Sequence, residues 1–349
     1  MPPLRLWFNQ AYRGTYHLVG QLRRRAAAQG GSLHVVGTHT APSTPFLQAC
    51  DVALPEREDL VGEAWVEHAL AFCAEHRIDV LVPGRERLAV AQARERFEAA
   101  GVRVMVGAPE GLRVLADKAT AHAWAVEAGV PVPLTHVVTD AEGFRAAYDD
   151  LRARGLRACL KPAVDHGAKG FRVLDEGAGG WADLQRLPDA RVHPDVVERL
   201  LAGQGRVAPL LVAELLEGDE LSVDVLADDG ELLCAVPRSK GGPQWTRLLV
   251  DDPAAVEIAE RVVKGLRLGY LLNVQVRYGG GTCRLLEVNT RAASGLFHSE
   301  HAGVDLGWAA LRLLLDGEVD VPAPRLGRTV LTYTAAMPVE LPAWGTLGA

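Results

Sequence analysis

The sequence predicts a mixed α/β and α+β protein, in which a doubly wound parallel sheet precedes two smaller α+β units. Short β-rich runs alternate with helical patterns over the first hundred or so residues, an order typical of parallel sheets. Strand pairs closed by tight turns follow later in the chain. A length of 349 residues also exceeds one ordinary core. We therefore expect domains at residues 1–108, 109–209 and 210–349.

The first unit is expected to bind its ligands at the carboxyl ends of its strands, as doubly wound sheets do. The loop 9–15 follows the first strand and lacks the G-x-G-x-x-G dinucleotide pattern. An ordinary strand-to-helix connection and a substrate-contacting loop both fit it. Strands are expected at 4–8, 32–37, 78–82 and 102–106, and helices at 16–29, 61–76 and 87–100.

The second unit is expected to begin at residue 109 and the third at residue 210. A helix opens at Asp117 and Lys118 and ends before Gly129 and the prolines that follow. The glycine and proline content of 176–209 suggests loops around short helices. Further strands are expected at 134–138, 157–161, 210–216, 220–227, 231–237, 272–278 and 282–289, and further helices at 140–154, 253–266 and 306–315.

Composition excludes several classes of protein. No run of eighteen uncharged apolar residues is present, which argues against a membrane span, and no secretory signal is visible at the N-terminus. We expect a cytoplasmic protein without a membrane partner. The net charge of −7 argues against a nucleic-acid surface. The five cysteines are far apart and form no C-x-x-C pair, so we interpret them as reduced core thiols.

The closing hairpin carries the strongest chemical signal. Side chains two apart on a strand share a face, so Glu287, Asn289 and Arg291 project together if the strand extends that far. The glycine turn at 279–281 brings Gln275 nearly opposite them. Magnesium prefers oxygen ligands, which suits Gln275, Glu287 and Asn289, whereas Arg291 suits a phosphoryl group or carboxylate. A solvated sheet face with four polar residues is the alternative.

Lysine is rare in this chain, and its placement is informative. Only five of the 37 basic residues are lysines. Lys161 ends a strand, and Lys169 lies between Gly167 and Gly170, where backbone N–H groups can approach phosphate oxygens. A plain turn is the alternative for this glycine-rich segment. Lys118 opens a helix, where an anion is favoured.

An acidic turn joins the strands at 210–216 and 220–227. Free backbone groups at such a turn can hydrogen-bond an adenine edge, and a carboxylate can hold ribose hydroxyls. The turn alone is unspecific. Its position after the lysine segment and before the acidic hairpin makes it informative.

In this order of motifs, residues 78–318 resemble the ATP-grasp superfamily, in the branch of carbamoyl phosphate synthetase and biotin carboxylase. The resemblance implies a Rossmann-like (pre-ATP-grasp) domain followed by a two-subdomain ATP-grasp fold that grips the nucleotide. The usual Asn-Pro-Arg is Asn289-Thr290-Arg291 here, which keeps both functional side chains. The glycine run of many relatives is replaced at 165–168 by Asp-His-Gly-Ala.

The resemblance also implies roles for individual residues. Lys118 and Lys161 would contact phosphates, and Glu214 with the backbone of Leu215 and Leu216 would bind adenine. Glu220 would hold the ribose. Magnesium, as one or two ions that Mn²⁺ can replace, would bind Gln275, Glu287 and Asn289. As implied catalytic residues, Arg291 would stabilise the transferred phosphoryl group and Arg238, which a surface position explains equally well, would bind substrate or phosphate.

The expected activity is that of an ATP-dependent carbon–nitrogen ligase. By resemblance, a small-molecule carboxylate would be activated as an acyl phosphate and coupled to an amine or similar nucleophile. A non-catalytic ATP-binding sensor or interaction module and an ATP-dependent phosphotransferase are the alternatives, and a homodimer fits all three. His298 and His301 suggest a zinc site, but spacing supplies no third ligand, so we interpret them as a polar rim.

Overall fold

The structure is a computed structural model that describes residues 2–164, 169–185, 187, 189–240, 246–333, 335–336 and 338–339. The chain forms two compact units. Unit 1 joins Met1–Arg113, Glu220–Gln275 and Val288–Ala349, and unit 2 joins Val114–Asp219 and Val276–Glu287. The division into domains at residues 108 and 209 stays a prediction. No helix in the described part of the chain is long and apolar enough to cross a membrane.

Unit 1 contains a parallel sheet with the strand order β3-β2-β1-β4-β5. Its central strand, β1, is buried from Leu6 to Asn9, which is expected of a strand covered on both faces. The strands are β1 (Leu4–Asn9), β2 (Leu33–His39), β3 (Val52–Pro55), β4 (Val80–Pro83) and β5 (Arg103–Val104). The helices are α1 (Thr15–Ala28), α2 (Gly62–His76), α3 (Arg87–Gln92), α4 (Arg94–Ala99) and α5 (Pro109–Leu115), with a 3₁₀ turn at Pro45–Ala49.

A second sheet has the order β15-β14-β11-β12-β13-β16. Its strands are β11 (Glu220–Asp228), β12 (Glu231–Ser239), β13 (Thr246–Leu249), β14 (Tyr270–Gly279), β15 (Thr282–Asn289) and β16 (Arg328–Leu331). The helix α9 (Pro253–Gly265) packs on β11 and β12, and α10 (Leu306–Asp316) follows a 3₁₀ helix at Leu296–Ala302. Beyond Gln275 the ribbon of β14 and β15 belongs to unit 2, and the chain returns to unit 1 at Val288.

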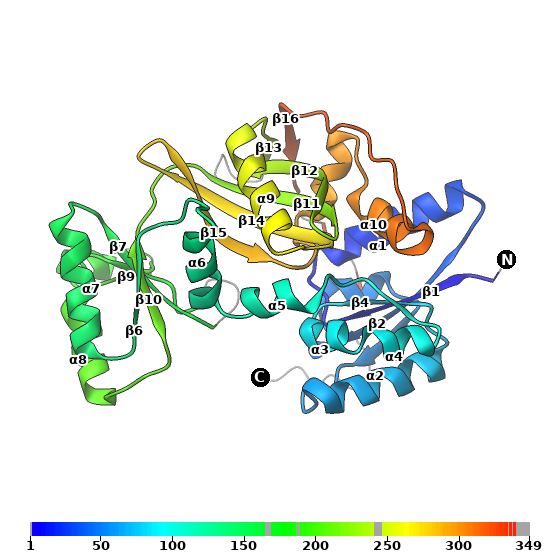
Figure 1. Cartoon of the computed structure of the whole chain (residues 1–349), viewed down its shortest axis with the longest axis horizontal. Coiled ribbons are helices and arrows are strands. Elements are labelled where there is room, and N and C mark those ends of the chain that lie inside the picture. Colours follow the sequence, from blue (N-terminus) through cyan, green and yellow to red (C-terminus); the bar gives the residue numbers. More distant parts are fainter. Residues whose placement is uncertain are drawn as a thin grey trace. The chain divides into compact units, whose positions relative to one another are not determined.

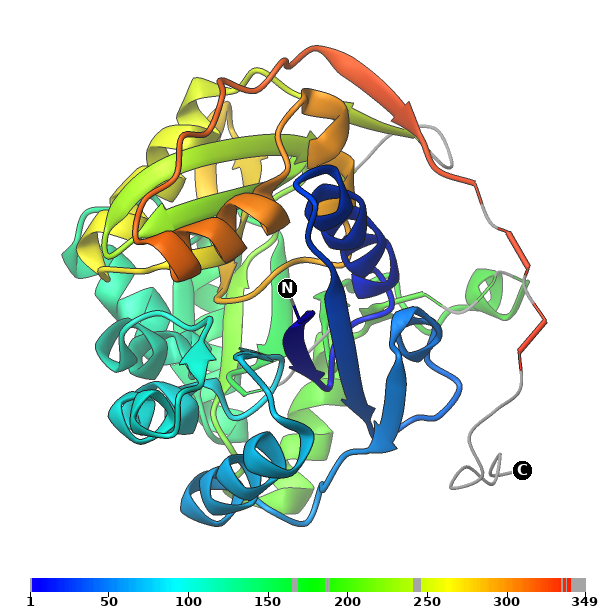
Figure 2. The same cartoon turned by 90° about the vertical axis from the view of Figure 1, so that its right-hand side faces the viewer.

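One apolar core holds the two sheets of unit 1 together. The helices α1 and α10 lie side by side (Figure 2) and bury residues from both sheets, among them Leu6 and Phe8 of β1 and Leu226 of β11. A separate cluster on the other face of the parallel sheet packs Trp7 against Trp65 of α2. Burial of such side chains contributes about 1.5–3 kcal/mol each.

Unit 2 is built on a sheet with the order β6-β10-β7-β8-β9. These strands are β6 (Thr135–Val138), β7 (Ala158–Pro162), β8 (Arg172–Leu174), β9 (Arg191–Val192) and β10 (Leu210–Glu214). The helices α7 (Ala141–Ala153) and α8 (Pro194–Gln204) cover one face (Figure 1), where Phe144 and Leu151 are fully buried. Asp117 caps the helix α6 (Lys118–Glu127), and a 3₁₀ turn lies at Trp181–Gln185.

The expected fold class is confirmed, with a parallel sheet followed by antiparallel sheets. The single helix expected at 87–100 is wrong, because the backbone turns out of helical geometry at Ala93 and separates α3 from α4. The strands β3, β13 and β16 were not expected. Each has only four residues and shows no clear strand pattern in the sequence. Pairing with another strand of the sheet stabilises each of them.

Candidate active site

Two lysines and one carboxylate meet in unit 2. Asp117 caps α6 by accepting a hydrogen bond from the Thr120 N–H at 2.8 Å, so Lys118 is the first helical residue. The Lys118 N–H donates to the Ala163 carbonyl at 3.1 Å, which ties α6 to the end of β7. The Lys118 Nζ lies 3.8 Å from the Glu287 Oε1. The hairpin therefore brings its carboxylate to the helix start.

Lys161 belongs to the same group. It lies on β7 opposite Leu211 of β10. Burial lowers its pKa, Glu287 opposes that effect, and the positive charge of Lys118 adds to it. Two ammonium groups face one carboxylate, so a further anion would stabilise the charged form of Lys161. Binding of phosphate by Lys118 and Lys161 stays a prediction.

The glycine-rich segment after β7 is described only in part. Gly167 lies outside the described residues. Lys169 is exposed, and Gly170 has a φ of +70°, which favours glycine. A Cβ at Gly170 would lie 2.7 Å from the Pro162 ring. Close packing on the end of β7 therefore explains this glycine, and the phosphate-binding role of Lys169 and Gly170 stays a prediction.

The predicted adenine-binding residues make contacts of their own. The Glu214 carboxylate forms an ion pair with Arg284 of β15, which the sequence did not reveal as a partner. The Leu215 N–H donates to the Arg157 carbonyl at 2.8 Å, so this donor is already paired within the protein. Leu216 is buried, and its side chain fills the space beside Gly279. These contacts hold the turn against the ribbon of β14 and β15.

Lys240 joins two predicted site residues in unit 1. Its Nζ donates to the Glu220 Oε1 and, at 3.0 Å, to the Gln275 Oε1. A backbone hydrogen bond also joins Lys240 to Glu220, since the Lys240 N–H donates to the Glu220 carbonyl at 2.8 Å. Sequence reasoning counted Lys240 among the five lysines but gave it no role. The rarity of lysine was the available signal.

Arg238 is not a surface residue. It is 7% exposed and forms an ion pair with Asp224, which is fully buried, at 2.7 Å from Nε to Oδ2. The Asn273 Nδ2 donates to the Asp224 Oδ1 at 2.9 Å and to the Ser222 Oγ at 2.8 Å. The surface interpretation of Arg238 is therefore wrong. Asp224 and Asn273 were missed, because an acidic residue within an apolar strand shows no local sign of its partner.

Two further predicted residues lie at the end of the hairpin, Asn289 as the last residue of β15 and Arg291 just after it. Arg291 donates to the Asn289 Oδ1 at 3.2 Å, and its guanidinium lies 3.9 Å from the centre of the Tyr12 ring. Asn289 and Arg291 are therefore neighbours in unit 1, together with the loop after β1. The interpretation of 9–15 as a substrate-contacting loop stays a prediction.

The predicted metal ligands include amide as well as carboxylate oxygens. In the described residues no group of three His, Cys, Asp or Glu side chains could hold a metal ion. His298 is buried, and its ring nitrogens contact the Gly295 carbonyl at 2.8 Å and the Thr332 Oγ1 at 2.9 Å. Burial lowers its pKa. The zinc alternative at His298 and His301 receives no support, and His298 lies inside the fold rather than on a rim.

Comparison with known proteins finds a family model that matches part of the C-terminal half of the chain. Residues 206–336 match the family ATPgrasp_Ter, described as ATP-grasp in the biosynthetic pathway with Ter operon. The large chain of carbamoyl phosphate synthase from Streptomyces avermitilis is 26% identical over 238 residues, which are 65% of this chain. The chain spans only 20% of that relative's length.

Solved structures share the fold over nearly the whole chain. The beta-gamma-ATP complex of biotin carboxylase from Campylobacter jejuni has a TM-score of 0.64 at 16% identity, over 93% of this chain and 73% of that one. An L-amino acid ligase from Bacillus licheniformis has a TM-score of 0.60 at 16% identity, over 90% and 75%. The resemblance expected from the motifs is confirmed, since residues 206–336 match an ATP-grasp family model.

Proposed function

We propose that this chain, whose residues 206–336 match an ATP-grasp family model, is an ATP-dependent carbon–nitrogen ligase that activates a small-molecule carboxylate and couples it to an amine or similar nucleophile. The single observation that carries the proposal is the group of Lys118, Lys161 and Glu287 in unit 2. A carbamoyl phosphate synthase and an L-amino acid ligase among the similar proteins support the reaction class.

The side chains present suit magnesium-ATP. Lys118 and Lys161 would bind phosphate oxygens, and the cost of burying the Lys161 ammonium falls when an anion neutralises it. Glu287, with the amide oxygens of Gln275 and Asn289, supplies the oxygen ligands that magnesium prefers. Mg²⁺, as one or two ions with Mn²⁺ as a substitute, would neutralise phosphate charge when bound.

The residues of this chain would do three things during catalysis. Lys118 and Lys161 hold the phosphates still, which lowers the entropic cost of reaction. Arg291, which is held by Asn289 and Tyr12, stabilises the charge on the phosphoryl group as it moves to the carboxylate. Glu214 and Glu220 complete the proposed nucleoside contacts, to adenine and ribose. Arg238 supports β11 and β14 through Asp224 and Asn273 and reaches substrate only if that network opens.

Two other functions need the same nucleotide-binding site. A non-catalytic sensor would bind ATP without turnover, and a phosphotransferase would release a stable phosphorylated product. The carboxylate and amine partners distinguish the ligase from both. The homodimer also stays a prediction.

The test measures ADP release from Mg-ATP with mixtures of carboxylic acids and amines, with product masses determined in parallel. We expect release that requires both substrates and a metal ion, and that falls at least 100-fold in Glu287→Gln and Lys161→Met. The matched control is Lys264→Met, because Lys264 is an exposed lysine of α9. An unchanged rate of ADP release in Glu287→Gln would refute the proposal. Mg-ATP binding without any turnover would favour the sensor.

A further inference from the structure

An apolar cavity lies inside unit 1, beside the carboxyl ends of β1 and β4. Its wall includes Phe8 of β1, Val82 and Pro83 of β4, Leu271 of β14 and Leu311 of α10, and all of its lining residues belong to unit 1. In the sheet order β3-β2-β1-β4-β5, the strands that follow β1 and β4 lie on opposite sides of this pair. Doubly wound sheets bind ligands where the strand order reverses in this way. The cavity therefore lies where the fold favours a ligand.

The size and lining of the cavity suit a short alkyl group. Its volume is about 60 Å³. A buried water needs about 10–15 Å³, so the space holds a group of about four or five heavy atoms. Leu6, Leu18 and Leu22 also line it and are at most 4% exposed. Apolar walls of this kind offer water no hydrogen bonds, which favours an alkyl occupant over water.

The wall carries one formal charge, which is positive. Arg291 is the one charged residue among the described residues that line the cavity. Its guanidinium donates to the Asn289 Oδ1 at 3.2 Å and the Ala292 carbonyl at 3.4 Å, so it contributes its charge here rather than open hydrogen-bond donors. A positive charge attracts a carboxylate and repels an ammonium group. An alkyl group that carries a carboxylate therefore suits the cavity better than an alkyl amine.

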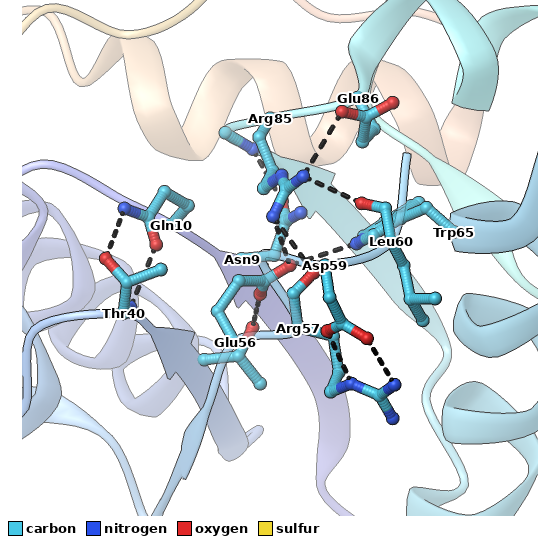
Figure 3. Close-up of polar contacts among 12 residues, drawn as sticks. Asn9, Gln10, Thr40, Glu56, Arg57, Asp59, Leu60, Trp65, Arg85 and Glu86 are labelled. Atoms are coloured by element: carbon cyan, nitrogen blue, oxygen red, sulfur yellow. Dashed lines mark hydrogen bonds and ion pairs between the residues drawn. The ribbon is translucent and has the colours of Figure 1, made fainter. Parts of the chain in front are cut away.

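Strained backbone supports the wall. Tyr270, which lines the cavity, has a φ of +62°, and Gln10, next to the lining residue Ala11, has a φ of +46°. Residues other than glycine rarely adopt such angles, and bulky ones least of all. The Gln10 side chain donates to the Thr40 Oγ1 and accepts from the Thr40 N–H, both at 3.0 Å (Figure 3). Strain of this kind occurs mostly at functional sites, where surrounding contacts enforce it.

The end of β4 is fixed close to β1. A Cβ at the lining residue Gly84 would lie 2.3 Å from the Asn9 carbonyl oxygen, so only glycine permits this approach. The Gly84 N–H also donates to the Asn9 Oδ1 at 2.7 Å. The next residue, Arg85, donates to the Leu60 carbonyl at 2.9 Å and lies near Glu86 (Figure 3). This part of the wall is therefore already formed without a ligand, as is usual for small-molecule sites.

From these observations we infer that the cavity binds the alkyl chain of the carboxylic acid that the enzyme activates, and so selects a short aliphatic monocarboxylate. The inference rests on the proposed function, because the lining residues Thr290 and Arg291 directly follow Asn289, a proposed magnesium ligand. Thr290 also stands where the usual Asn-Pro-Arg has proline, which adds a hydroxyl-bearing residue to the wall. An aliphatic amine is the rival occupant.

The test is thermal unfolding of the whole chain with the sodium salts of acetate, butyrate, pentanoate and octanoate, or with butylamine, at constant ionic strength. The melting temperature should rise from acetate to pentanoate, with an apparent affinity that grows about fourfold for each methylene. Octanoate should bind more weakly than pentanoate, since its chain exceeds the cavity. Butylamine should leave the melting temperature unchanged.

Two variants change the cavity in opposite senses. Ala292→Leu adds bulk to a lining residue and should weaken pentanoate binding about tenfold or more. Met105→Ala shortens a lining side chain, so the preferred acid should become about three carbons longer, which makes octanoate the best ligand. The matched controls are Ala254→Leu, at an exposed alanine of α9, and Leu70→Ala, which lies in the cluster on the other face of the parallel sheet. Both should keep the chain-length preference of the wild type.

Each outcome decides the inference. A preference for pentanoate that moves to octanoate in Met105→Ala, but not in Leu70→Ala, supports it, even if Ala292→Leu fails to fold. Equal effects of all four acids on the wild type, or the same preference in Met105→Ala as in the wild type, overturn it. Stabilisation by butylamine equal to that by pentanoate overturns the assignment to the acid. If Mg-ATP fails to stabilise even the wild type, the proposed function is at fault, while the chain-length preference still tests the cavity.

Discussion

Replacing Arg238 by methionine should strongly destabilise unit 1. The substitution keeps an unbranched side chain of similar length but removes the charge. Asp224 is fully buried and would keep only the hydrogen bond from Asn273. A carboxylate left buried without its cation costs far more than the ion pair itself contributes.

The magnitude follows from burial. Breaking a buried ion pair by removing one partner costs about 3–5 kcal/mol. In a unit of this size each kilocalorie lowers the melting temperature by about 2–4 °C, which gives a decrease of about 6–20 °C. Asp224→Asn in the Arg238→Met background removes the buried charge and should restore at least about 1 kcal/mol.

The free energy of unfolding would be measured in guanidinium chloride by circular dichroism, together with thermal melting. Arg312→Met is the matched control, because Arg312 forms a half-exposed ion pair with Asp316 on α10 and should cost less than about 1 kcal/mol. The reasoning fails if Arg238→Met melts within 2 °C of Arg312→Met, or if the double variant loses the sum of both single effects.

Two further predictions concern buried titratable groups. Burial lowers the pKa of Lys161, so its charge destabilises the fold at neutral pH, and this cost disappears as the pH rises toward 10.5. Lys161→Met should therefore raise the free energy of unfolding by about 1 kcal/mol at pH 7 while losing ADP release, and a gain that persists above pH 10.5 would contradict this. Burial raises the pKa of the Cys50 and Cys73 thiols to about 12 from 9.0, so both should resist alkylation at pH 8 until the protein unfolds, as mass spectrometry of the labelled peptides would show. Because the unfolded thiols ionise first, their contribution to stability should be lost as the pH rises from about 9 toward 12.

The order of the elements was predictable because helix and strand periodicities are local. The strand containing Lys161, the helix that starts at Lys118 and the closing hairpin all lie within a residue or two of their expected bounds. The candidate phosphate-binding and metal-binding residues were chosen from those positions. Their grouping in unit 2 is a result of the structure, since Lys118 and Glu287 are far apart in the sequence.

Pairing between distant residues could not be predicted in the same way. The ion pair of Arg238 with Asp224 depends on the register of β12 against β11, and one residue of slip would turn these side chains to opposite faces. The contact of Lys240 with Gln275 likewise joins the end of β12 to β14, and these two strands are not neighbours in their sheet. Neither partner carries a local mark of the other.

By itself the sequence determined the chemistry. It showed which side chains are rare and which residues lie at the ends of strands or the starts of helices. It also showed that the order of the motifs resembles that of the ATP-grasp superfamily. Only the tertiary structure decided which charges are paired. It buried Arg238 against Asp224, and it left the Nδ2 of Asn9 without an acceptor in the described chain. The physical reason is that electrostatic and hydrogen-bond energies depend on distance in space, whereas periodicity reports only neighbours along the chain.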